Sequence, residues 1–297
     1  MNKKIFLFPA FVLKYIGSEV ELLKTNNIDL NEKLNHLSDL TGVNVVDYDI
    51  KNNNFLDDEI RNQLITYLIS CLYADILKTR SIFPKYIAAL SMGLYSALYC
   101  AGSVSYHDGA LLIKRIFDFI YKQTRDKKYK MLAVTGLSKD DIEEINNKNN
   151  LSCEVVIKNN NLSYIITGED FQIRKFYDIA NEEGAFHLNL FPVSIPYHSK
   201  HIETTGFSEE VFRDISFKPP GCGIISSVDQ KLLSVDKEVS DEIINNLTQP
   251  VNWHKTMKSL ISLGEQEFIE CGPGDSLKRI SKFIEGDHKI ISLSKLL

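Results

Sequence analysis

The sequence predicts an α/β protein in which a smaller subdomain interrupts a larger one. An apolar run at residues 84–90 leads through Ser91 into a second apolar run at residues 95–101, which is typical of a buried strand that turns into a helix. Strand and helix patterns follow one another in the order β-α-β-β-α-β between residues 129 and 193, which is the ferredoxin-like arrangement. The 297 residues, 44% of them hydrophobic, suffice for one large domain with an insert.

The charged stretch at residues 124–128 marks where we expect the insert to begin. We therefore assign residues 1–127 and 195–297 to the large subdomain and residues 128–194 to the small one. In the first part of the chain we expect a strand at 3–8, a loop or helix start at 9–14, an edge segment at 44–48, a helix opened by the acidic residues 57–59, the strand and helix around Ser91, and a helix at 107–123.

The rest of the chain continues the alternation of strands and helices. We expect strands at 131–134, 153–157, 162–167, 185–193, 223–228, 267–271 and 289–292; helices at 139–147 and 170–183, one that ends at 241–246 and one from 275; and a loop at 247–253 that enters a further helix.

Composition excludes several classes of function. A net charge of −5 argues against nucleic acid as a partner, and no apolar run reaches the length of a membrane span. The five cysteines form no CxxC pair, which is typical of reduced thiols in a cytoplasmic protein. Neither metal-ligand spacing nor a phosphate-binding loop occurs. We therefore expect a cytoplasmic monomer without cofactor or metal.

Ser91 is the first candidate for chemistry. A strand that turns sharply into a helix through a serine lifts the hydroxyl out of the sheet and directs the N–H groups of the helix N-terminus at the group it attacks. Thioester and ester chemistry needs this arrangement, which is called a nucleophile elbow. The x-x-Ser-x-Gly pattern is weak on its own, and an idle serine in an ordinary strand–turn–helix stays open at this point.

Four segments, taken together, resemble one known family. They are the elbow at residues 89–98, the Ile-Pro-Tyr-His-Ser segment at 195–199, the Asn-Leu-Thr-Gln-Pro-Val-Asn-Trp segment at 246–253 and the Glu-Cys-Gly-Pro-Gly turn at 270–274. In order and spacing they are similar to the motifs of the malonyl-CoA:acyl-carrier-protein transacylase family, including the free-standing acyltransferases and acyl hydrolases of trans-acyltransferase polyketide synthases. The family fold is an α/β-hydrolase-like large subdomain with a ferredoxin-like insert.

The resemblance implies a role for five residues. Ser91 would be the nucleophile and His198 the general base, with the backbone carbonyl of Asn246 orienting the imidazole. The backbone N–H groups of Met92 and Phe11 would form the oxyanion hole. The implied substrates are acyl thioesters of CoA or of the 4′-phosphopantetheine arm of an acyl carrier protein, which would be the protein partner in polyketide or fatty acid biosynthesis.

One departure from the family bears on the acyl group. Malonyl-using members carry an arginine on the second helix, and counting from Asp108 that position is Ile116. Arg115 is one residue away, about 100° around the helix, and we expect it to pair with Asp118 on the surface. We expect Ile116, together with Leu90, Tyr197 and Met131, to line an apolar acyl pocket.

An apolar pocket favours acyl groups without a carboxylate, because an unpaired buried charge costs about 3–5 kcal/mol. The favoured interpretation is hydrolysis of stalled acyl groups, or transfer of acetyl or other simple acyl groups. Whether water or a carrier thiol is the acceptor stays open. Malonyl transfer, with Arg115 shifted into the pocket, and a degenerate scaffold that only binds a carrier protein are the alternatives.

Overall fold

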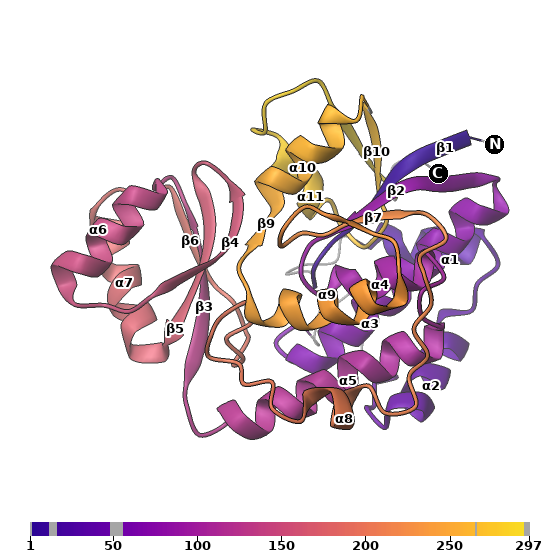
Figure 1. The fold of residues 1–297 in the computed structure, drawn as a ribbon, viewed down its shortest axis with the longest axis horizontal. Coiled ribbons are helices and arrows are strands. Elements are labelled where there is room, and N and C mark those ends of the chain that lie inside the picture. Colours follow the sequence, from indigo (N-terminus) through magenta and orange to yellow (C-terminus); the bar gives the residue numbers. More distant parts are fainter. Residues whose placement is uncertain (1, 12–16, 48–55, 265, 294–297) are drawn as a thin grey trace.

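The protein consists of two subdomains, each built around its own sheet (Figure 1). The computed structural model describes residues 2–11, 17–47, 56–264 and 266–293. The large subdomain has a six-stranded sheet in the order β11-β10-β1-β2-β7-β8, and the small one has a five-stranded sheet in the order β6-β3-β5-β4-β9. The α/β-hydrolase-like body with an inserted ferredoxin-like subdomain is therefore confirmed.

The sheet of the large subdomain is parallel apart from its β7–β8 edge. Its central strand β1 is an apolar run with Ile5 to Phe8 fully buried, as a parallel strand covered on both faces requires. The elements of this subdomain are β1 (Asn2–Phe8), α1 (Ser18–Thr25), α2 (Leu30–Thr41), α3 (Glu59–Thr79), β2 (Ile82–Ala89), α4 (Gly93–Cys100), α5 (Tyr106–Thr124), α8 (Phe207–Val211), β7 (Gly223–Ile225), β8 (Leu232–Leu233), α9 (Asp236–Thr248), α10 (Trp253–Ser262), β10 (Glu267–Glu270), α11 (Ser276–Ser281) and β11 (Lys289–Ser292).

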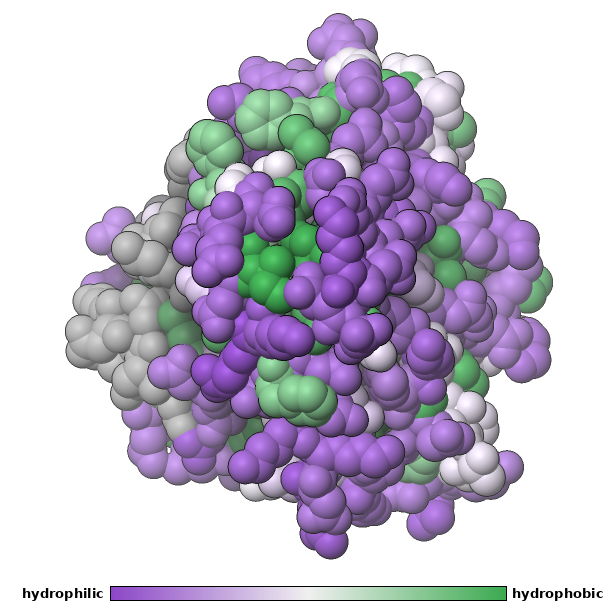
Figure 2. Space-filling view, turned by 90° about the vertical axis from the view of Figure 1, so that its left-hand side faces the viewer, coloured by the Kyte–Doolittle hydropathy of each residue, from purple (hydrophilic) through white to green (hydrophobic). Residues whose placement is uncertain are grey.

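The small subdomain has a hydrophobic core of its own, which includes Leu132, Ile166 and Phe176. Its strands pair antiparallel in the order β6-β3-β5-β4, which is the ferredoxin-like order. The elements are β3 (Tyr129–Thr135), α6 (Lys139–Asn149), β4 (Glu154–Asn160), β5 (Ser163–Glu169), α7 (Asp170–Glu182) and β6 (His187–Leu190). Seen from its outer side, this subdomain presents a mostly hydrophilic face (Figure 2).

Two sequence predictions about local structure are wrong. Residues 44–47 form no strand: Val45 is fully buried within an irregular segment, and its N–H donates to Ser38 Oγ at 3.0 Å instead of to a neighbouring strand. The segment 247–253 is no simple loop, because β9 (Val251–Asn252) pairs in parallel with β4 and Trp253 already begins α10. Tyr48 and residues 12–14 of the expected 9–14 segment lie outside the described residues.

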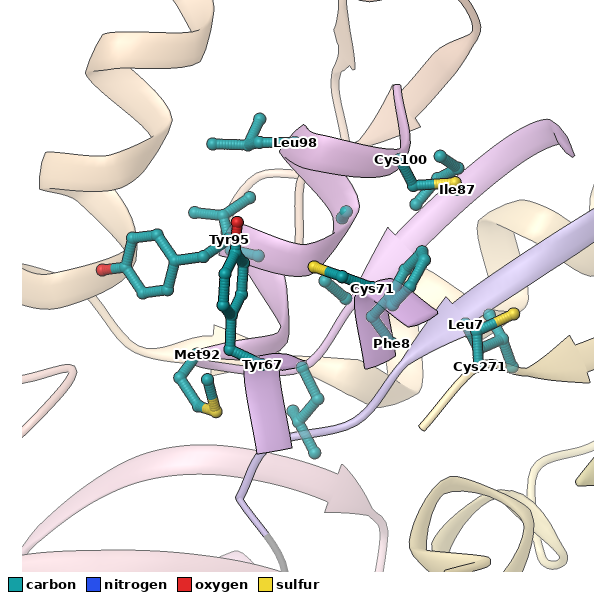
Figure 3. Close-up of a cluster of buried hydrophobic side chains, with 14 of the residues drawn as sticks. Leu7, Phe8, Tyr67, Cys71, Ile87, Met92, Tyr95, Leu98, Cys100 and Cys271 are labelled. Carbon is teal, nitrogen blue, oxygen red and sulfur yellow. The ribbon is translucent and has the colours of Figure 1, made fainter. Parts of the chain in front are cut away.

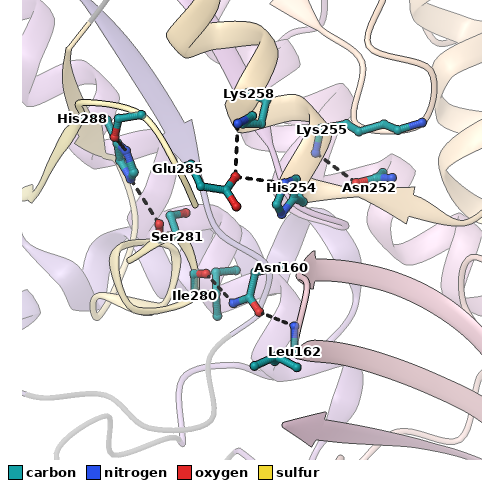
Figure 4. A network of polar contacts seen from close by, with 11 residues as sticks. Asn160, Leu162, Asn252, His254, Lys255, Lys258, Ile280, Ser281, Glu285 and His288 are labelled. Carbon is teal, nitrogen blue, oxygen red and sulfur yellow. Dashed lines mark hydrogen bonds and ion pairs between the residues drawn. The ribbon is translucent and has the colours of Figure 1, made fainter. Parts of the chain in front are cut away.

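The strand β9 also joins the two subdomains, since it comes from the large one and extends the sheet of the small one. Close by, Asn160 Nδ2 donates to the carbonyl of Ile280 at 3.0 Å, and Lys258 forms a 3.1 Å ion pair with Glu285 (Figure 4). The β4–β9 pairing and the Asn160–Ile280 hydrogen bond connect the small subdomain to the large one, whereas the Lys258–Glu285 pair lies within the large subdomain. In the part of the chain that the structure describes, no helix is long and apolar enough to cross a membrane.

Candidate active site

Ser91 lies at a sharp turn between β2 and α4. The turn begins where β2 ends beside β1, and there the Leu90 N–H donates to the carbonyl of Phe8 at 2.9 Å. Ser91 itself has φ +54°, in the left-handed region that residues with a Cβ rarely adopt. Such a conformation costs of order 1–3 kcal/mol and concentrates at functional sites. Met92 follows as the N-cap of α4.

The structure explains why the residue two positions after Ser91 is a glycine, Gly93. A Cβ at this position would lie 2.4 Å from the carbonyl oxygen of Phe8 and 2.6 Å from that of Pro9. The helix α4 can therefore approach the end of β1 only with glycine here. Beneath the elbow lies a cluster of buried side chains that includes Phe8, Cys71 and Leu98, which holds the turn in place (Figure 3).

His198 faces Ser91 from the segment that returns from the small subdomain. Its Nε2 lies 2.7 Å from Ser91 Oγ. The backbone of His198 also has a left-handed φ of +63°, and its N–H donates to the carbonyl of Leu247 at 2.7 Å. The imidazole Nδ1 is hydrogen-bonded to the backbone carbonyl of Asn246, near the end of α9.

These contacts determine the protonation state of the ring. A carbonyl oxygen only accepts hydrogen bonds, so Nδ1 of His198 carries the proton. Burial disfavours the charged imidazolium and lowers the pKa of His198 to about 4, although the bond to Asn246 opposes this shift. The ring is therefore neutral at pH 7, and its unprotonated Nε2 is free to accept the Ser91 hydroxyl proton.

The two residues whose backbone N–H groups the resemblance implies for the oxyanion hole, Met92 and Phe11, lie at the same cavity as Ser91. Among the described residues, neither the Met92 N–H nor the Phe11 N–H has a hydrogen-bond acceptor, and both residues line the cavity that holds Ser91 and His198. The Phe11 ring packs edge-on against Phe191, with ring centroids 6.0 Å apart, and so bridges the two subdomains beside the cavity.

The cavity brings together most of the side chains that the sequence analysis named, but not all. Its lining residues are Phe11, Gln63, Ser91, Met92, Tyr95, Ile113, Ile116, Tyr197, His198, Asn246 and Leu247. Leu90 and Met131, which we expected in the acyl pocket, are not among them, although both belong to the same buried core cluster as several of the lining residues.

Ile116 lines the cavity and Arg115 does not. The Arg115 guanidinium donates to the backbone carbonyls of Val211 and Arg213, which fixes it between α5 and the end of α8. The expected pairing of Arg115 with Asp118 is wrong: Lys114, one helical turn before Asp118, takes that carboxylate. No lysine or arginine is among the described residues that line the cavity.

Sequence reasoning missed Gln63, Tyr95, Ile113 and Leu247 as lining residues. Ile113 and Leu247 carry no signal that separates a pocket wall from a core. Gln63 does carry one, since it is an amide beside the apolar residues of α3, and the structure shows that it is only 5% exposed. In the described part of the chain, no cluster of three or more His, Cys, Asp or Glu side chains could hold a metal ion.

The fold and this geometry define an α/β protein with a nucleophile elbow and a facing neutral imidazole. No protein-family model matches the chain. It is 25% identical over 313 residues to the malonyl CoA-acyl carrier protein transacylase of Bacillus subtilis, covering 99% of this chain and 94% of that protein. The transacylase of the same name from Synechocystis is 26% identical over 283 residues, covering 94% and 93%. The resemblance to the malonyl-CoA:acyl-carrier-protein transacylase family is thus confirmed along the whole chain.

Solved structures show the same fold. FabD from Acinetobacter baumannii superposes with a TM-score of 0.84 at 24% identity, covering 99% of this chain and 95% of that one. A malonyl-transacylase solved in complex with a type II PKS acyl-carrier protein superposes with a TM-score of 0.83 at 19% identity, covering 98% and 96%.

Proposed function

We propose that the protein is an acyltransferase that carries an acyl group on Ser91 between a thioester donor and the pantetheine thiol of an acyl carrier protein. The observation that carries this proposal is the 2.7 Å contact between Ser91 Oγ and the unprotonated Nε2 of His198. The same contact argues against a degenerate scaffold, since a protein that only bound a carrier protein would have no need of it.

In the first half-reaction, Ser91 Oγ bonds to the thioester carbonyl carbon while its proton passes to His198 Nε2. The N–H groups of Met92 and Phe11 would hold the oxyanion that forms. The tetrahedral intermediate then collapses, the carbon–sulfur bond breaks, and the leaving thiolate takes the proton from His198. In the second half-reaction the carrier thiol gives its proton to His198 and its sulfur bonds to the acyl carbon. The ester carbon–oxygen bond then breaks, and His198 returns the proton to Ser91 Oγ.

We further propose that the acyl group carries no carboxylate. Ile116 lines the cavity and offers a carboxylate no positive charge. The Arg115 guanidinium is bound outside the cavity by the backbone carbonyls of Val211 and Arg213. Binding a carboxylate without a partner in the cavity would cost about 3–5 kcal/mol, which is a loss of several hundred-fold or more in binding.

Malonyl transfer is the second candidate, and a specific observation favours it. The relatives in Bacillus subtilis and Synechocystis, which match nearly the whole chain, are both named malonyl CoA-acyl carrier protein transacylases. The names of these relatives therefore support malonyl as the acyl group, whereas the composition of the cavity supports an uncharged one. The same names favour a carrier thiol over water as the acceptor.

One experiment separates these candidates. The protein is incubated with acetyl-CoA, butyryl-CoA or malonyl-CoA, with and without holo carrier protein, and intact mass is followed on both proteins. The proposal expects acetyl or butyryl on Ser91 and then on the carrier. Faster loading by malonyl-CoA would establish the second candidate, and free acid without loaded carrier would establish hydrolysis.

A further inference from the structure

Besides Ser91, His198 and Asn246, three residues with polar side chains line the cavity, and none of the three is needed for the chemistry at Ser91. Among the described lining residues they are Gln63 on α3, Tyr95 on α4 and Tyr197, which directly precedes His198. All three are buried, with exposed fractions of 5%, 4% and 9%. Polar groups buried at such a place are normally hydrogen-bonded, so their partners can be accounted for one by one.

Two polar atoms of these three side chains have no hydrogen-bond partner among the described residues. The Gln63 Nε2 donates to Tyr197 Oη at 2.9 Å. The Gln63 carbonyl oxygen and the Tyr95 hydroxyl have no hydrogen-bond partner among the described residues, although both residues line the cavity. In Figure 3 the Tyr95 ring points away from Cys71 and the buried cluster. One donor and one acceptor therefore stay free to meet a ligand.

The surroundings disfavour a charged ligand group at this place. The Glu59 carboxyl lies behind Tyr197, where it also accepts a 2.9 Å hydrogen bond from the Ser194 N–H. A second carboxylate in the cavity would lie near this acidic group, and no lysine or arginine is among the described lining residues to neutralise it. A hydroxyl group suits the site better, because it can accept from Tyr95 and donate to Gln63 at the same time.

We propose that Gln63 and Tyr95, with Tyr197 holding the Gln63 amide, form a hydroxyl-binding subsite in the acyl pocket, so that hydroxyacyl groups are preferred over saturated acyl groups of equal length. This inference rests on the proposed acyl-enzyme at Ser91. In the free protein the Gln63 carbonyl oxygen and the Tyr95 hydroxyl are not sealed from solvent, and water can satisfy them. A purely apolar chain that displaced this water would leave both without a partner, whereas a chain that brings a hydroxyl group would replace it.

The test compares loading rates of Ser91 with butyryl-CoA, 2-hydroxybutyryl-CoA and 3-hydroxybutyryl-CoA, each hydroxy compound as both enantiomers. Intact-mass time courses give kcat/KM for each donor. We expect at least one hydroxyacyl donor to exceed butyryl-CoA by about tenfold or more, which corresponds to one satisfied hydrogen bond. Tyr95→Phe and Gln63→Leu should each bring this ratio close to one.

Tyr121→Phe is the matched control, because Tyr121 lies on the surface of α5 with 44% exposure and should leave the ratio unchanged. A wild-type ratio near one for both hydroxy compounds overturns the subsite, as does a ratio that survives in both variants. If one variant does not fold, the other and the wild-type ratio still decide. Absence of any acyl group on Ser91 with all donors contradicts the proposed function itself, and the two failures are thereby distinguishable.

Discussion

The carbonyl oxygen of Asn246 accepts a hydrogen bond from Nδ1 of His198. A neutral backbone carbonyl thus stands where a carboxylate orients the imidazole in many serine hydrolases. It fixes the tautomer and the direction of the ring, but it adds no negative charge that would raise the imidazole pKa. The buried ring therefore stays neutral well below pH 7.

This neutrality predicts the pH dependence of acylation. Because burial lowers the pKa of His198 to about 4, the base stays unprotonated as the pH falls from 8 to 5. A histidine with the ordinary pKa of about 6.5 would lose roughly 30-fold over that range. We expect single-turnover loading of Ser91 to change less than twofold between pH 8 and pH 5, with far-UV circular dichroism confirming that the protein stays folded. A midpoint between pH 6 and 7 would contradict this.

The identity of residue 116 predicts the choice of acyl group. Ile116→Arg places a guanidinium at the cavity wall, so loading from malonyl-CoA should rise at least tenfold relative to loading from butyryl-CoA. Ile116→Gln is the control, because it adds polarity without charge and should leave malonyl loading low. The prediction is wrong if the arginine variant keeps the wild-type ratio.

The close approach of α4 to β1 predicts a packing cost. Gly93→Ala sets a Cβ against the carbonyl oxygens of Phe8 and Pro9, so we expect a loss of about 1–3 kcal/mol or more in the free energy of unfolding. Denaturant unfolding measures it. Gly168→Ala is the control: its added Cβ would meet the nearest atoms at an ordinary 3.6 Å. Equal effects of the two substitutions would contradict the account of the elbow.

Glu242, one turn before Asn246 on α9, predicts how stability depends on pH. Burial raises the pKa of its carboxyl to about 7, and one carboxyl oxygen has no hydrogen-bond partner among the described residues. Between pH 4.5 and pH 7 the unfolded chain therefore ionises this group while the folded protein keeps the proton. Stability is lost as the pH rises through this window, by about 3 kcal/mol for this group.

Glu242→Gln removes that loss, so its stability relative to the wild type should improve between pH 4.5 and pH 8. Urea unfolding at both pH values measures the difference, with the exposed substitution Glu209→Gln as control. Two other groups titrate nearby: Glu270, with a pKa also raised by burial to about 7, acts in the same direction, and His198 acts in the opposite one. Both are present in all three proteins. A constant difference between variant and wild type would contradict the assignment.

Local pattern was enough to predict most of the fold. Strand β1 and helix α3 are strongly apolar, and the six elements from β3 to β6 follow one another in an order that has few alternatives. The two-residue strand β9 could not be predicted, because only its partner β4, nearly a hundred residues earlier, makes it a strand. The segment around Val45 was wrongly predicted to be an edge strand, because burial alone does not make a strand without a partner strand beside it.

The candidate site, too, could be predicted from the sequence only in part. The sequence named Ser91 and His198 through motifs, and the structure places the two side chains 2.7 Å apart. The sequence could not separate cavity wall from core: Leu90 and Met131 are as apolar as Ile113, but only Ile113 is among the residues that line the cavity. The partner of Arg115 was also beyond reach, because the carbonyls of Val211 and Arg213 come from a distant segment.

The most direct test of the account is the mass of the protein after brief incubation with an acyl-CoA donor. The account predicts one acyl adduct on the wild type, mapped to the peptide that contains Ser91, and none on Ser91→Ala, while circular dichroism shows both proteins folded. An adduct that persists on Ser91→Ala, or a wild type that takes up no acyl group from butyryl-, hydroxybutyryl- or malonyl-CoA, would contradict it.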